Sequence, residues 1–231
     1  MADKLKKLPF FLPFAGCRGQ CVYCNQRAIT GVTEVPSPDY VRAVLKDIKE
    51  PREICYFGGS FCRFPEETIK AYLDCVAEYA PAGSAVRFST YPGDLRDDAL
   101  RALIKKYPVS RIELGIPTLD PAVLAACRRE ADPEKIFEDI SLLMKDSLPV
   151  GVQMMIGLPG QRRESSLRDL TRLAELKGGE RWERSRRTSV SISRNVSSPS
   201  SAKMSAMMRS SRSSRYSSAS IEARPYWTAS C

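Results

Sequence analysis

Three cysteines stand close together near the start of the chain, at Cys17, Cys21 and Cys24. Their spacing, C-x3-C-x2-C, directly follows an apolar run at residues 8–14 that predicts a buried strand. A loop that leaves a strand end, with glycines that let the backbone curl, can direct three sulfurs to one point. Three converging thiolates suit a soft metal centre, and iron–sulfur clusters are held by such cysteines. A four-iron cluster held this way would keep one iron for a non-protein ligand.

Two other interpretations of these cysteines stay open. Structural zinc usually has two C-x-x-C pairs or one such pair with distant histidines. The chain has no histidine, and its other five cysteines are scattered singly. A disulfide framework needs an oxidising compartment, and no secretory signal precedes the loop. The pattern therefore favours a cluster over zinc, and a reducing cytoplasm as the location.

The net charge of +9 is concentrated in one part of the sequence. Residues 178–231 carry a balance of +7, whereas the 177 residues before them carry +2. The charge of this nearly neutral body gives no support for nucleic acid as a partner. No apolar stretch is long enough to span a bilayer, so no membrane partner is expected.

Hydrophobic periodicity predicts alternating strands and helices, and so an α/β fold with a parallel sheet. The expected strands lie at residues 8–14, 53–57, 86–90, 111–115 and 150–156. The expected helices lie at residues 39–50, 66–79, 97–106, 121–129, 133–145 and 163–176. In such sheets, binding and catalytic residues collect at the carboxyl ends of the strands.

The cysteine loop resembles the radical S-adenosylmethionine (SAM) superfamily, whose signature is C-x3-C-x-aromatic-C, with Tyr23 in the aromatic place. The longer string FLPFAGCRGQCVYCNQRAITG is similar to the branch that contains the Elongator catalytic subunit, which is related to the oxygen-independent coproporphyrinogen oxidases. The resemblance implies a partial (βα)6 TIM-like barrel of about five strand–helix units. It also implies that the three cysteines ligate a 4Fe–4S cluster and that SAM chelates the free iron.

The resemblance further implies a SAM site at the strand ends. Gly58, Gly59 and Ser60 follow the second expected strand, where the family docks the SAM amino group; a plain tight turn is the alternative. Ser89 and Thr90 end the third strand and could bind ribose hydroxyls, or form a solvated strand end.

The fourth and fifth strands supply the remaining candidates. Glu113 lies in an apolar strand and needs a partner: a SAM amine or ribose, or an internal salt bridge with Arg128 or Arg129. Ile156 and Gly157 begin a turn similar to the family's G-L-P-G turn, which lies beside the adenine.

The implied function is reductive cleavage of SAM to a 5′-deoxyadenosyl radical that acts on an unknown substrate. Such a protein needs an electron donor such as flavodoxin or ferredoxin as a partner. A non-catalytic iron–sulfur or zinc-binding module, or an inactive truncated fragment, is the alternative.

The resemblance covers the expected radical SAM core, residues 1–177, and stops where the composition changes. From residue 178, serine and arginine dominate, and residues 190–193 give only a weak strand pattern, so a disordered tail is expected. A true Arg/Ser tail, a linker to a further domain, or a frame change in the underlying gene would each explain it. The abrupt switch where a sixth strand is due favours the frame change.

Overall fold

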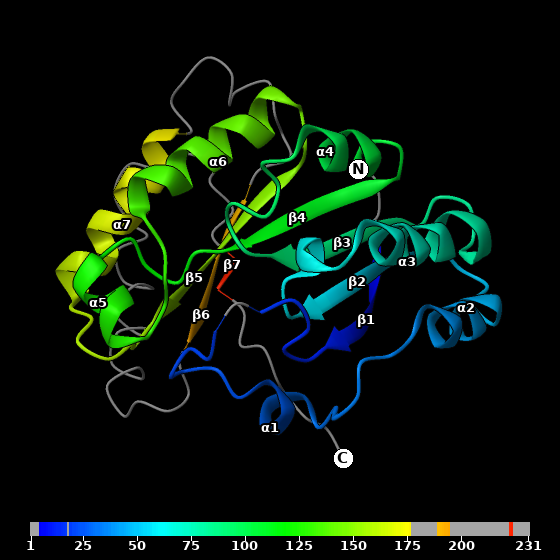
Figure 1. Ribbon diagram of the computed structural model, residues 1–231, viewed down its shortest axis with the longest axis horizontal. Coiled ribbons are helices and arrows are strands. Elements are labelled where there is room, and N and C mark those ends of the chain that lie inside the picture. The colour runs from blue at the N-terminus through cyan, green and yellow to red at the C-terminus, as the bar shows by residue number, and fades with distance from the viewer. Residues whose placement is uncertain (1–4, 18, 177–188, 195–221, 224–231) are drawn as a thin grey trace.

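The computed structural model describes residues 5–17, 19–176, 189–194 and 222–223, and its strands form one parallel sheet in the order β1 to β7 (Figure 1). The strands are β1 Lys6–Leu12, β2 Arg52–Gly58, β3 Ala85–Thr90, β4 Val109–Gly115, β5 Val150–Ile156, β6 Ser189–Arg194 and β7 Glu222–Ala223. The helices are α1 Gln26–Thr30, α2 Pro38–Lys46, α3 Glu66–Tyr79, α4 Asp98–Ile104, α5 Pro121–Ala126, α6 Pro133–Lys145 and α7 Arg163–Glu175, with a 3-10 turn at Phe61–Arg63.

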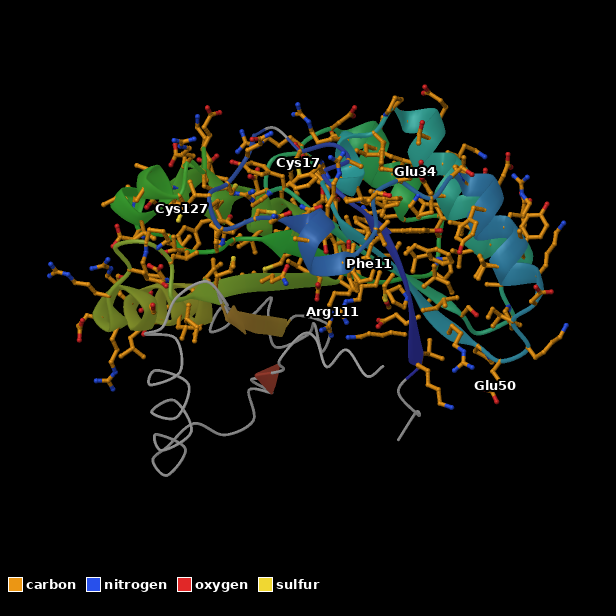
Figure 2. The ribbon with its side chains drawn as sticks, turned by 90° about the horizontal axis from the view of Figure 1, so that it is seen from below. Phe11, Cys17, Glu34, Glu50, Arg111 and Cys127 are labelled. Carbon is orange, nitrogen blue, oxygen red and sulfur yellow. The ribbon has the colours of Figure 1, made fainter. Side chains whose placement is uncertain are left out.

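Alternation along the strands separates two faces of the sheet. Ile54 and Tyr56 of β2 belong to the main hydrophobic core, together with Leu45 of α2 and Leu73 of α3. The helices gather mainly on one side of the sheet (Figure 2). The residues of β2 that alternate with Ile54 and Tyr56, Glu53 and Cys55 among them, therefore face the other side, which carries polar and charged groups.

The α/β fold and the five expected strands are confirmed, with strand ends shifted by at most two residues. The short helix α1, directly after the cysteines, was not expected. Its start is fixed by Asn25, whose side chain accepts a hydrogen bond from the backbone of Ala28 at 3.2 Å.

Within residues 178–231, where a disordered tail is expected, the structure describes two short strands. β6 pairs in parallel with β5, with Ser189 opposite Gly151, and β7 pairs with β6. The edge of β5 offers a row of backbone donors and acceptors, which an extended segment of almost any composition can pair with. The other residues of the expected tail lie outside the described part of the chain.

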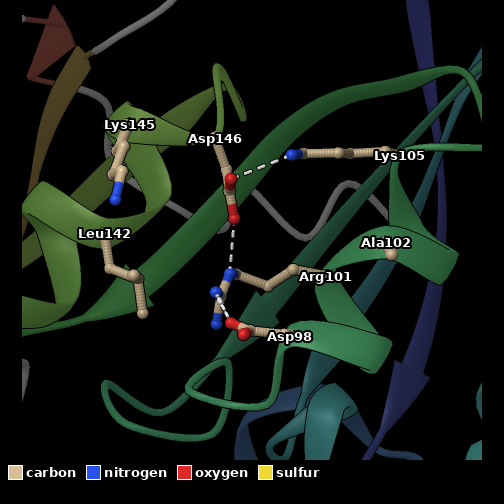
Figure 3. Close-up of a pocket in the computed structure, with 7 residues that line it drawn as sticks. All are labelled: Asp98, Arg101, Ala102, Lys105, Leu142, Lys145 and Asp146. Atoms are coloured by element: carbon tan, nitrogen blue, oxygen red, sulfur yellow. Dashed lines mark hydrogen bonds and ion pairs between the residues drawn. The ribbon is translucent and has the colours of Figure 1, made fainter.

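A network of ion pairs ties α4 to the end of α6 (Figure 3). The side chain of Arg101 is 5% exposed and donates to Asp146 at 2.6 Å and to the carbonyl of Leu95 at 2.8 Å. Lys105 also pairs with Asp146, at 2.9 Å. The hydrogen bond from Arg101 holds the pKa of the Asp146 carboxyl below its ordinary value. These residues line a groove of about 440 Å³ whose charged groups are largely paired with one another.

This network predicts a loss of stability in acid. Because the folded pKa of Asp146 is lowered, the unfolded state binds the proton more readily, and the contribution is full above about pH 5 and disappears as the pH falls below about 4. We expect Asp146→Asn to have a lower free energy of unfolding than the parent at pH 7. As the pH falls from about 5 to below about 4, the free energy of unfolding should decrease less in this variant than in the parent. Urea unfolding at several pH values measures both, and parallel pH profiles for parent and variant would contradict the assignment.

No helix within the described ranges combines the length and the apolar character that crossing a membrane requires.

Candidate functional site

The paired glycines after β2 support the backbone of the cysteine loop. Gly59 donates its N–H to the carbonyl of Leu12 at 2.9 Å, and Ser60 donates to Ala15 at 2.7 Å. A Cβ at Gly59 would overlap the backbone of Ala15 and would lie 2.7 Å from its nitrogen. Gly58 has a φ of +118°, a conformation that side chains rarely adopt. The turn after β2 thus fixes where the cysteine loop leaves β1.

Two polar side chains, Gln26 and Arg129, lie beside the three thiols of the cysteine loop. The side-chain nitrogen Nε2 of Gln26 lies 3.4 Å from Sγ of Cys24 and 4.0 Å from Sγ of Cys17. Nη1 of Arg129 lies 3.8 Å from Sγ of Cys21. Cys17 is exposed and the other two are half-buried. Desolvation raises the pKa of the Cys17 and Cys24 thiols, and the hydrogen bond from Gln26 opposes that rise.

Tyr23 anchors the far end of the cysteine loop. Its ring packs against a small hydrophobic cluster of Val123, Cys127 and Leu158, beside Met155. The backbone of Val22 next to it donates to the carbonyl of Cys127 at 3.1 Å. Burial raises the pKa of the Tyr23 hydroxyl. The aromatic position of the motif therefore joins the loop to α5 and to the turn after β5.

Arg129 reaches the cysteine loop because of how α5 ends. Arg128 adopts a left-handed φ of +52°, while Arg128 N and Arg129 N bond the carbonyls of Ala125 and Leu124. This is the Schellman pattern, which ends the helix at a left-handed residue and changes the direction of the chain at Arg129. The site residue itself was missed by sequence reasoning, which weighed Arg129 only as a partner of Glu113.

The guanidinium of Arg129 is held from two sides. Nη2 donates to the carbonyl of Gly115 at 2.7 Å, and the group lies 4.2 Å from the ring centroid of Tyr91. Its Nε is buried and has no hydrogen-bond partner among the described residues. A buried donor without a partner is costly, so this cation beside Cys21 indicates a site for an additional acceptor or anion.

Ser60 and Thr90 are both buried, and their hydroxyls are engaged within the protein. The two side-chain oxygens lie 3.1 Å apart, and Ser60 also donates to Asp94 at 2.5 Å. Thr90 accepts from the backbone of Cys62 at 3.2 Å. These contacts join the turn after β2 to the end of β3. Ser89 points to the opposite face by alternation, where its strand register places it beside Glu113.

Glu113 has a different partner from those that the sequence suggested. It is 3% exposed and forms an ion pair with Arg87 of β3, which also lies 3.4 Å from Glu53 of β2. The salt bridge to Arg128 or Arg129 is therefore wrong, since the strand register puts Arg87 and Glu113 on one face of neighbouring strands.

Arg87, Glu113 and Glu53 lie on the face of the sheet opposite to Ile54 and Tyr56, which is the inner face of the sheet. Arg111 stands opposite Arg87 in the register. In Figure 2, Arg111 and Cys17 are clearly separated. Sequence alternation alone could have placed these residues on one face, but it could not have given their pairing.

The turn after β5 presents backbone rather than side chains. The side chain of Ile156 is buried, and Gly157 has a φ of +82°. Gln161 closes the turn, since its oxygen accepts from Leu158 N and its nitrogen donates to the carbonyl of Met155, both at 3.1 Å. Any contribution of Ile156 to a ligand would come from its main chain.

The donor set of the cysteine loop is compatible with an iron–sulfur cluster. Among the described residues, no three histidine, cysteine, aspartate or glutamate side chains are arranged to hold a single metal ion. A 4Fe–4S cluster makes a different demand, because each thiolate binds a different iron and the sulfurs stand farther apart than around one zinc ion. Three thiols, hydrogen-bond donors directed at their sulfurs and the unpartnered Nε of Arg129 all match an anionic cluster with a further ligand.

A parallel α/β sheet with a three-cysteine loop after its first strand defines a radical SAM domain. The sequence profile of the radical SAM superfamily matches residues 11–173. The chain therefore belongs to the radical SAM superfamily.

Curated relatives and solved structures agree with this assignment. The chain is 25% identical over 185 residues to the heme chaperone HemW of Lactococcus lactis, covering 77% of this chain and 48% of the relative. It is 27% identical over 187 residues to HemW of Escherichia coli, covering 75% and 49%. The chain thus spans about half the length of the curated relatives it matches.

Two solved structures show the same fold at low identity. Coproporphyrinogen III oxidase (HemN) of Escherichia coli, a radical SAM enzyme, superposes with a TM-score of 0.59 and 17% identity, covering 87% of this chain and 46% of that one. Elp3 of Methanocaldococcus infernus gives a TM-score of 0.56 and 16% identity, covering 81% and 45%. The expected resemblance to the radical SAM superfamily is confirmed, and these two structures share the fold of this chain.

Proposed function

We propose that Cys17, Cys21 and Cys24 hold a 4Fe–4S cluster whose fourth iron binds SAM. The observation that carries this proposal is the shared surroundings of the three thiols, in which Gln26 and Arg129 direct polar nitrogens at their sulfurs. When bound, the cluster and SAM supply one-electron cleavage of the C5′–S bond and a 5′-deoxyadenosyl radical that abstracts hydrogen from a substrate.

The residues around the cysteine loop position these groups and control their surroundings. The turn at Gly58 and Gly59 fixes the loop, and its backbone carbonyl groups would be the acceptors for the SAM amine. Arg129 supplies positive charge beside Cys21, where the anionic cluster and the SAM carboxylate would lie. The main chain at Ile156 and Gly157 would lie beside the adenine. Ser89 and Glu113 remain candidates for the ribose, on the inner face of the sheet.

Anaerobic reconstitution with iron and sulfide tests this proposal. We expect about four irons and four sulfides per chain, and an EPR signal after dithionite reduction that changes when SAM is added. The variant with Cys17→Ser, Cys21→Ser and Cys24→Ser should retain less than about one iron. Production of 5′-deoxyadenosine, measured by chromatography, reports the cleavage.

Cys55→Ser is the matched control, because Cys55 is buried on the sheet and its Sγ donates to the Glu53 carbonyl at 3.2 Å, a bond that a serine hydroxyl can keep. This variant should keep the full cluster. One zinc per chain in place of iron would favour a zinc-binding module, and an iron content unaffected by the triple substitution would contradict the assignment of the ligands.

A second candidate is heme binding, favoured by the names of the HemW relatives. With no histidine in the sequence, an axial ligand to heme iron would come from cysteine, methionine or tyrosine. Titration of the reconstituted protein with hemin, followed by absorbance, separates this candidate from cluster binding. An unchanged heme spectrum would remove it and leave the cluster proposal intact.

A further inference from the structure

The carboxamide of Gln26 has a fixed orientation. Its oxygen Oε1 accepts a hydrogen bond from the backbone N–H of Phe14 at 2.6 Å. Phe14 has a left-handed φ of +57°, which belongs to the turn that carries the chain from β1 into the cysteine loop. Because the oxygen must face a donor, the amide nitrogen must face the other way. The side chain is therefore an oriented donor, although Gln26 is only half-buried.

The amide nitrogen of Gln26 faces two of the three thiols. Nε2 lies 3.4 Å from Sγ of Cys24 and 4.0 Å from Sγ of Cys17, and an amide carries two N–H groups. The third thiol, Cys21, has Arg129 as its neighbour. Gln26 thus offers a neutral donor pair to the two sulfurs that the arginine does not approach.

We propose that Gln26 tunes the reduction potential of the cluster by hydrogen-bonding the thiolates of Cys17 and Cys24, an inference that rests on the proposed cluster site. Reduction adds negative charge to the cluster and its sulfurs, so a donor to sulfur stabilises the reduced form more than the oxidised form. The amide makes the cluster easier to reduce without adding a charge to the loop.

Two substitutions separate this role from a purely structural one. Gln26→Glu keeps an oxygen for the N–H of Phe14 but removes both donors, and Gln26→Leu removes both functions. Arg27→Gln changes the net charge by the same amount as Gln26→Glu at an exposed neighbouring position, and so controls for charge alone.

We expect redox titrations followed by EPR to show more negative midpoint potentials for both Gln26 variants. At a fixed solution potential, the ratio of reduced to oxidised cluster should fall roughly tenfold, the size of one charge-assisted hydrogen bond, with the larger shift in Gln26→Glu. Arg27→Gln should stay close to the parent. Equal potentials in the parent and in Gln26→Glu, with full iron content, would overturn the inference and leave the cluster proposal standing.

A measurement on the parent protein needs a variant only to assign the signal. Electron–nuclear double resonance of the reduced cluster, with the side-chain amide of glutamine labelled with ¹⁵N, should show coupling that Gln26→Glu lacks. Absence of that coupling in a protein that carries its cluster would also overturn the inference. Failure of the parent to bind any cluster would remove the proposed function and this inference together, a result that iron analysis detects first.

Discussion

Replacing Gly59 with alanine is expected to abolish cluster assembly while changing no thiol. The added Cβ would overlap the backbone of Ala15, which lies between β1 and the first cysteine of the loop. Backbone atoms cannot rotate away as a flexible side chain can, so either the loop or the turn after β2 must move. The bonds from Gly59 to Leu12 and from Ser60 to Ala15 would break with that movement. We expect iron content after reconstitution to fall at least about tenfold, because a cluster needs all its ligands placed together.

Gly19→Ala is the matched control for this prediction. Gly19 lies inside the cysteine loop, yet a Cβ there would meet nothing within 4 Å, so its variant should bind iron like the parent. The rate at which iodoacetamide alkylates the iron-free thiols gives a second readout, which should rise in Gly59→Ala only. Full iron content in Gly59→Ala would show that the turn after β2 does not fix the loop.

The second large effect is expected from the buried charges on the inner face of the sheet. Arg87 pairs with Glu113 and with Glu53, and the side chains of Arg87 and Glu113 are 6% and 3% exposed. Removing the arginine leaves Glu113 charged in a poorly hydrated place. We expect Arg87→Met to lower the free energy of unfolding by about 3–5 kcal/mol, measured by urea denaturation.

Two comparisons sharpen this prediction. The double variant Arg87→Met with Glu113→Leu should be more stable than Arg87→Met alone, because it removes one of the stranded carboxylates. Lys70→Met breaks an exposed pair with Asp74 and should leave the free energy of unfolding close to that of the parent. A cost below about 1 kcal/mol for Arg87→Met would show that the charges are hydrated rather than buried.

Sequence patterns predicted the fold well where a single element explains its own pattern. β5 was predicted with its observed bounds, because a continuous apolar run is typical of a strand covered on both faces. α2 begins within one residue of its expected start, where the Ser37 hydroxyl accepts a hydrogen bond from Tyr40 N at 3.2 Å and caps the helix. α1 escaped prediction because five residues are too few to show a helical period.

The site was predicted less evenly. The cysteine motif identified its own three thiols, since ligand spacing within one loop is a local property. Pairing between strands is not local, and Glu113 found Arg87 only through the register of β3 and β4. β6 is a similar case, because its parallel pairing with the edge of β5 joins segments that are far apart in the chain.

By itself, the sequence determined which residues could bind a cluster, the class of fold and the strand ends at which a cofactor site would form. Cysteine spacing, hydrophobic periodicity and turn residues express those properties within a few neighbouring positions. Only the tertiary structure decided that Gln26 and Arg129 lie beside the sulfurs. It also decided that the hydroxyls of Ser60 and Thr90 hydrogen-bond each other and the neighbouring turns. These contacts join residues far apart in the chain or depend on how a turn directs one side chain. Their geometry therefore appears only once strands, loops and helix ends have packed together.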